Sequence, residues 1–155
     1  MASAAPTNNQ ARDLNQQKWG KANLDAGFTI IPNVIFERQR ELGLDSLDLA
    51  IIIHIIGRWW SPKSKPFPAK AAIALALGVH SRTIQKRIAA MERKGLVHRQ
   101  ERRIPGERSL TNMYNLAGLA AAAEPYSIEK LRGRIERQRA SDAAALRNSS
   151  LPIGS

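Results

Sequence analysis

The hydrophobic pattern divides the first sixty residues into a polar stretch and two apolar segments. Residues 1–26 are rich in Asn, Gln, Ala and Lys without a sustained period, so we expect a disordered N-terminal tail. A β-prone run follows at 28–31. A helix is predicted from Pro32 to Gly43, since proline suits the first position of a helix and glycine its end. The segment 47–60 is apolar on nearly all sides, which predicts a buried helix.

The middle of the chain alternates between helical and extended patterns. A short alanine-rich helix is predicted at 69–77, and a glycine separates it from a second helix at 81–94. Strands are predicted at 96–101 and 110–116, with a Pro-Gly turn between them. Two helices joined by a short turn and followed by a β-hairpin form a winged helix-turn-helix arrangement.

The last part of the chain is rich in alanine and arginine. A helix is predicted at 127–147, with a thin apolar stripe among basic residues. We therefore expect a disordered tail at 1–26, a DNA-binding domain at 27–119 and a basic helical extension with a loose tail at 120–155. The predicted fold class is mainly α with a small antiparallel β-wing, a winged helix-turn-helix.

Composition excludes several classes of function. Cysteine is absent, so disulfides, thiolate metal sites and cysteine nucleophiles cannot occur. No apolar run approaches the ~20 residues that cross a bilayer, and the first residues lack the pattern of a secretory signal, so we expect a cytoplasmic protein. Phosphate-loop, dinucleotide, zinc-protease and serine-hydrolase motifs are absent. We expect no enzymatic activity, no cofactor, no metal site and no membrane association, and the sequence indicates no small-molecule ligand.

Charge then indicates the class of partner. The chain has a formal net charge of +11, and residues 58–108 carry 13 Lys and Arg against 3 Glu, a net +10. Residues 1–57 have a net charge of −1 and residues 109–155 of +2. A basic excess concentrated in one third of the chain favours a polyanionic partner, most simply double-stranded DNA.

The segment 81–94 has the pattern of a DNA-recognition helix. Ile84, Ile88 and Met91 share one face, which predicts burial. The opposite face combines long cations with a short neutral residue: Arg82, Lys86, Ala89 and Arg93. Arg, Gln and Lys can reach base edges, and Ser or Thr can donate to a phosphate near the helix N-terminus. The candidate DNA-binding residues on this helix are Ser81, Arg82, Thr83, Gln85, Lys86 and Arg93.

The predicted hairpin adds a second group of arginines around its Pro105-Gly106 tip. These candidate DNA-binding residues are Arg99, Arg102, Arg103 and Arg108. Arginine side chains on such a tip can follow the phosphate backbone or enter a narrow minor groove.

The run LGVHSRTIQKRIAAMERKGLV at 77–97 resembles the recognition half of bacterial winged-helix proteins. In those families a Leu-Gly-Val turn precedes the recognition helix, and Gly-Leu-Ile/Val opens the wing. The segment 112–116, NMYNL, is similar to the Asn-x-Tyr-x-Leu return strand of phage and plasmid helix-turn-helix proteins, and 28–60 resembles their N-terminal strand and two helices. The resemblance covers residues 27–119 and implies the fold and DNA binding. His80 departs from it, because the pattern usually has a capping Ser there.

These observations leave three functional hypotheses. The main one is sequence-specific binding of double-stranded DNA that regulates transcription, with a recognition helix at 81–94 and a wing at 96–116. The first alternative is origin binding in plasmid or phage replication. The second, from another class, is a protein-interaction module built on the same fold. Because one winged helix reads few base pairs, we also expect a homodimer on paired half-sites.

Overall fold

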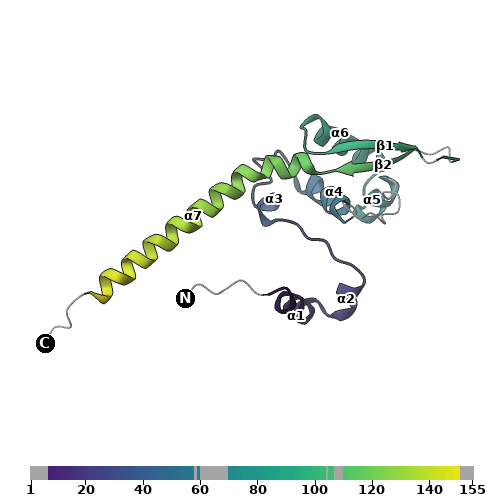
Figure 1. Cartoon of the computed structure of the whole chain (residues 1–155). Coiled ribbons are helices and arrows are strands. Elements are labelled where there is room, and N and C mark those ends of the chain that lie inside the picture. The colour runs from purple at the N-terminus through teal and green to yellow at the C-terminus, as the bar shows by residue number, and fades with distance from the viewer. Residues whose placement is uncertain (1–6, 58, 60–69, 104, 107–109, 151–155) are drawn as a thin grey trace. The chain divides into compact units, whose positions relative to one another are not determined.

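The structure is a computed structural model that describes residues 7–57, 59, 70–103, 105–106 and 110–150 (Figure 1). The chain divides into two compact units, Met1–Ile31 and Pro32–Ser155. The second unit therefore contains most of the predicted DNA-binding domain together with the predicted C-terminal extension.

Within the first unit the structure contains two helices, α1 (Asn8–Trp19) and α2 (Lys21–Asp25). The prediction of a stretch without regular structure is therefore wrong for residues 8–25. A capping box between Thr7 and Gln10 starts α1, and Gly20, with a φ of +82°, ends it. The helix buries no residue, so its sequence shows no apolar period, and local capping and helix propensity account for it.

The β-prone run at 28–31 forms no strand, contrary to the prediction. Its Phe28 and Ile30 side chains are exposed, and the two described strands pair only with each other. A strand needs a partner for its backbone groups, and β propensity alone does not provide one.

The predicted helix at 32–43 is shorter than expected. Helix α3 covers Asn33–Glu37 and buries Val34 and Ile35, and turns follow to Gly43, whose φ is +72°. The turns place Leu42 and Leu44 in the core. The apolar positions were therefore identified correctly, but a change of backbone conformation lies between them.

Helix α4 covers Ser46–Ile56 and forms the centre of the core. Asp45 caps it in a reciprocal box with Asp48, in which each carboxylate accepts a hydrogen bond from the other residue's backbone N–H. Ile51, Ile52 and Ile55 are almost completely buried, as the apolar pattern predicts. The last predicted residue of this helix, at position 60, lies outside the described residues.

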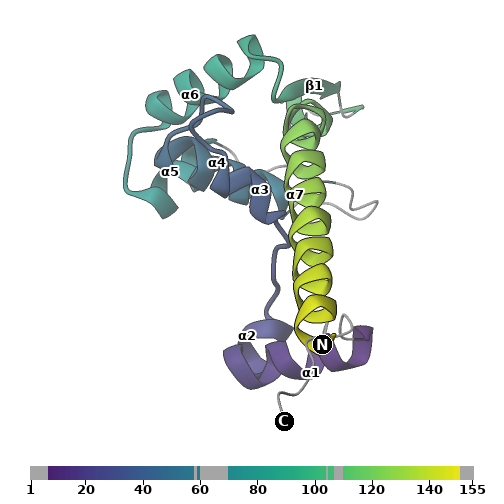
Figure 2. The same cartoon turned by 90° about the vertical axis from the view of Figure 1, so that its left-hand side faces the viewer.

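The predicted helix pair and hairpin are confirmed as elements. Helix α5 covers Lys70–Leu77, α6 covers Ser81–Arg93, β1 covers His98–Arg103 and β2 covers Leu110–Asn115. The strands form one antiparallel sheet in which Gln100 faces Met113 and Arg99 faces Tyr114. Helix α6 packs on α4 and α5, and α3 lies between α4 and α7 (Figure 2). The second unit is thus mainly helical with one small antiparallel sheet.

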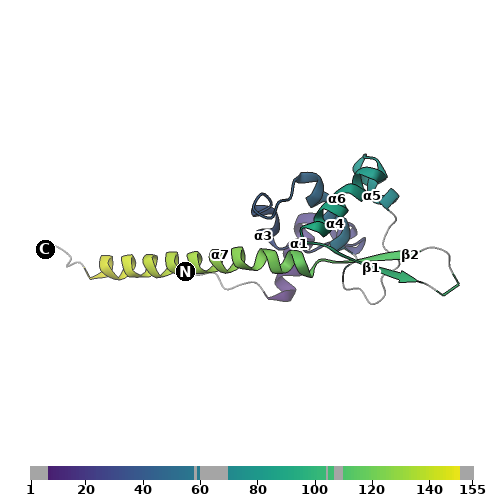
Figure 3. The ribbon, with the colours of Figure 1, turned by 90° about the horizontal axis from the view of Figure 1, so that it is seen from above.

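Helix α7 runs without interruption from Ala117 to Ser149, so it begins ten residues before the predicted start at 127. Its first turns are buried through Leu119 and Ala123, and this packing stabilises helix on the N-terminal side of Pro125. Proline usually ends or kinks a helix, and Pro125 nevertheless lies inside α7. The hairpin and α7 extend from opposite ends of the helical core (Figure 3).

Candidate nucleic-acid interface

Helix α6 is amphipathic in the way its spacing predicts. Ile84 and Met91 are fully buried and Ile88 is 2% exposed, so this face packs into the core. Arg82, Lys86 and Arg93 are exposed. At 100° per residue these three cations fall within about 40° of one another on the opposite side of the helix.

On one flank of α6, Arg87 forms ion pairs with residues at the start of α4. The Arg87 guanidinium donates to the Asp45 carboxylate and lies 3.5 Å from that of Asp48. The Asp48 backbone N–H, followed by Arg87, holds the pKa of Asp45 below its ordinary value. The hydrogen bond to the Asp45 carboxylate in turn raises the pKa of Arg87. Arg87 therefore connects α6 to the cap of α4 and is turned away from the exposed line.

Two further charged residues of this region, Lys94 and Glu92, also make contacts within the second unit. Lys94 donates to the backbone carbonyl of Gly43. On the other flank, Glu92 lies 3.6 Å from the Arg99 Nε on β1. Both contacts hold α6 against its neighbours. Glu92 is the one acidic residue of α6, and its ion pair with Arg99 lies away from the exposed cations.

The outcome is a row of cations without acidic partners. Among the described residues, Arg82, Lys86 and Arg93 have no ion pair. At the N-terminal end of the row, His80, Ser81, Arg82, Thr83 and Lys86 line an open hollow of about 450 Å³. The His80 side chain makes no capping hydrogen bond, so the first backbone N–H groups of α6 have no side-chain acceptor. This end suits an anion.

The structure thus brings together part of the predicted site. Ser81, Arg82, Thr83 and Lys86 share the hollow, Gln85 is exposed beside them, and Arg93 lies about three turns away on the same line. Ala89 is half-buried, so it lies less in the open than its predicted place on that face.

The predicted arginines of the hairpin lie in different settings. Arg99 is on the strand next to α6 and pairs with Glu92, so it helps to hold the hairpin against the helix. Arg102 and Arg103 occupy the end of β1, opposite Thr111 and Leu110. Arg108 lies outside the described residues.

Sequence reasoning did not identify one feature near this surface, the pairing of Arg87 with the α4 cap. Asp45 precedes Arg87 by 42 positions, and no local pattern connects the two. No three His, Asp or Glu side chains in the described part of the chain lie close enough together to hold a metal ion. Of the helices that the structure describes, none is both long and apolar enough to span a membrane.

Comparisons with known proteins concern the fold. The chain matches no protein-family model and no curated protein. It is similar to the crystal structure of the N-terminal domain of DnaD protein from Geobacillus kaustophilus HTA426, with a TM-score of 0.52 and 17% sequence identity. The match covers 85% of this chain and 99% of that chain. At this identity the similarity shows a shared fold, which is largely helical with a small antiparallel sheet.

Proposed function

We propose that residues 32–119 form a winged helix-turn-helix domain that binds double-stranded DNA. Helix α6 is the recognition helix and the β1–β2 hairpin is the wing. The observation that carries the proposal is the row Arg82, Lys86 and Arg93, which is exposed, lies opposite the buried face of α6 and has no acidic partner among the described residues. A helix that presents such a row can enter the major groove with its buried face toward the domain.

In this proposal the two ends of the interface make different contacts with DNA. Arg82, Gln85 and Lys86 reach base edges, and the N-terminus of α6 receives a phosphate through Ser81, Thr83 and free backbone N–H groups. Arg102 and Arg103 contact the phosphate backbone from the wing. Arg87 and Lys94 hold the helix in place and do not contact DNA.

Between the two processes considered from the sequence, the likeness to the DnaD N-terminal domain favours the replication alternative over transcription regulation. We therefore propose that the domain binds a replication origin or an adjacent site. A homodimer on paired half-sites stays a prediction, which light scattering of the full chain tests. The genomic fragments that the protein enriches distinguish replication from transcription regulation. Enrichment of origin fragments would support this proposal, and enrichment of promoter fragments would contradict it.

The DNA interface is tested by mobility shift on a duplex selected from random DNA and on a random duplex. Arg82→Ala or Lys86→Ala should reduce the preference for the selected duplex by ~1–3 kcal/mol, the value of a good bidentate base contact. Arg102→Ala should weaken both duplexes evenly. Arg147→Ala, an exposed arginine in the last turn of α7, is the matched control and should change neither. Equal losses for Arg147→Ala and Arg82→Ala would contradict the assignment to α6.

A further inference from the structure

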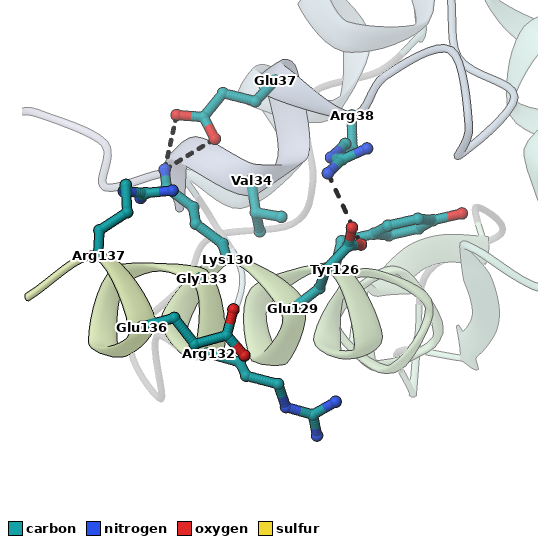
Figure 4. Close-up of a pocket in the computed structure, with 10 residues that line it drawn as sticks. All are labelled: Val34, Glu37, Arg38, Tyr126, Glu129, Lys130, Arg132, Gly133, Glu136 and Arg137. Atoms are coloured by element: carbon teal, nitrogen blue, oxygen red, sulfur yellow. Dashed lines mark hydrogen bonds and ion pairs between the residues drawn. The ribbon is translucent and has the colours of Figure 1, made fainter. Parts of the chain in front are cut away.

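Within the described part of the chain, helix α7 contacts the rest of its unit through one face. Its first turns are buried through Leu119 and Ala123, and beyond Pro125 ion pairs connect it to α3 and the residue that follows α3. Lys130 donates to both carboxylate oxygens of Glu37 at 2.8 Å, and Arg38 lies 3.7 Å from Glu129. Arg38 also stacks over Tyr126, 5.4 Å from the ring centroid. These side chains line a groove between α3 and α7 of about 510 Å³ (Figure 4).

The opposite side of the same turns carries large apolar residues. Ile128, Leu131 and Ile135 are 49%, 53% and 53% exposed. Their spacing of three and four residues places them on one stripe, centred about 180° from the side that meets α3. None of the three lines the groove, whereas Tyr126, Lys130 and Gly133 do. The contacts of Tyr126, Glu129 and Lys130 with the α3 region therefore fix α7 in an orientation that turns this stripe outward.

Arginines border the stripe on both sides. Arg132 and Arg139 follow one edge and Arg134 the other, and all three are exposed. Glu129 lies toward α3, beside Arg38, whereas Glu136 lies beside Arg132 at the edge of the stripe (Figure 4). The outward surface between 128 and 139 thus combines three apolar residues with three cations and one acid at its edge, Glu136, so cations outnumber acids on it.

We propose that this stripe is the docking site for an amphipathic helix of a partner protein, with acidic residues on both sides of its apolar face. The three apolar residues span about 10 Å of α7, which matches two turns of a partner helix. Charge complementarity selects the partner. A second copy would bring the same three arginines toward each other, and duplex DNA would leave the apolar residues facing phosphates and water. The site is separate from the α6 surface, so it can recruit a protein while DNA is bound.

The test uses the full chain and a fluorescent 16-residue peptide with leucines on one helical face, glutamates beside them and alanine elsewhere. Fluorescence anisotropy should show binding to the unaltered protein. A peptide with lysine in place of each glutamate, or with the leucines scrambled off one face, should bind at least about tenfold more weakly. Leu131→Asp should weaken binding about tenfold or more, and so should Arg132→Glu combined with Arg139→Glu.

The matched control is Leu146→Asp, because Leu146 is also an exposed leucine but lies about three turns beyond Ile135 on the same helix. It should leave peptide binding unchanged, and circular dichroism of each variant checks that α7 remains helical. Failure of the acidic peptide to bind, or equal binding to Leu131→Asp, overturns the proposal. It is also overturned if the full chain is a dimer that Leu131→Asp dissociates, or if that change reduces duplex affinity instead.

Discussion

Gly118 lies where α7 begins and passes closely over the chain reversal between α6 and β1. A Cβ at this position would be 1.9 Å from the carbonyl oxygen of Gly95 and 3.0 Å from its carbon. The next residue, Leu119, donates its backbone N–H to the Leu96 carbonyl at 3.0 Å and is 2% exposed. Non-bonded heavy atoms prefer separations of about 3.5 Å, so Gly118→Ala must move the start of α7 by more than about 1 Å.

The cost follows from three contributions. Forcing a methyl group into a packed site typically costs about 1–3 kcal/mol. Loss of the hydrogen bond between Leu119 and Leu96 adds about 1 kcal/mol. The higher helix propensity of alanine stabilises the folded state by about 1 kcal/mol relative to glycine and offsets part of this cost. We therefore expect Gly118→Ala to lower the free energy of unfolding by about 1–3 kcal/mol.

Gly133→Ala is the matched control on the same helix. The nearest atom to a Cβ there is the Arg137 Nη1 at 3.5 Å, an ordinary contact with a flexible side chain. This change should raise the free energy of unfolding by up to about 1 kcal/mol. Urea denaturation of the two variants measures both values. A Gly118→Ala variant as stable as the unaltered protein would refute the close approach of α7 to Gly95.

Two further predictions concern electrostatics. If about four to six cations meet phosphates, log K for duplex binding should fall with log salt at a slope of roughly −4 to −5, and a slope near zero in a filter-binding titration would exclude the interface. Asp45→Asn keeps the cap of α4 but removes the charge that Arg87 contacts. Because the folded protein holds the pKa of Asp45 below its ordinary value, the charged form stabilises the fold at neutral pH, and this contribution disappears as the pH falls below about 4. The difference in unfolding free energy between the unaltered protein and Asp45→Asn should therefore narrow below that pH in urea titrations. A constant difference would show that the charge of Asp45 does not contribute to stability.

The parts of the fold that the sequence predicts well are those with both an apolar period and a marked end. Helix α6 has Ile84, Ile88 and Met91 at helical spacing, and glycines at 78 and 95 with φ of +68° and +73° lie outside its two ends. Strand β2 places Tyr114 in the core and Met113 at the surface, as its alternation predicts.

The parts that sequence reasoning missed depend on information outside the local pattern. Helix α1 buries nothing and therefore leaves no apolar period to detect. Helix α7 continues through Pro125, against the usual effect of proline, because Leu119 and Ala123 are packed before it in the chain and Tyr126 and Lys130 make contacts after it. In both cases the helix exists for reasons that a window of residues around it does not contain.

The candidate site shows the same limit. The five cations of 81–94 are equivalent in composition, and a helical wheel separates them only by face. The structure assigns Arg87 and Lys94 to contacts with the segment before α4, at Asp45 and Gly43. Both partners lie more than forty positions away in the chain. A basic helix therefore cannot be read as an interface residue by residue until its long-range ion pairs are known.

Backbone contacts at Gly95 and Leu96 connect the two proposed surfaces. The Leu96 backbone N–H donates to the Met91 carbonyl at the end of α6, and its own carbonyl accepts from Leu119 at the start of α7. Gly118 approaches Gly95 too closely for any side chain. The end of α6 and the start of α7 are therefore joined through two consecutive residues, with the contacts to the α3 region fixing α7 farther along. A partner on the α7 stripe would accordingly be held at a defined position relative to DNA on α6, and loosening the joint through Gly118→Ala should disturb that relation without altering either surface.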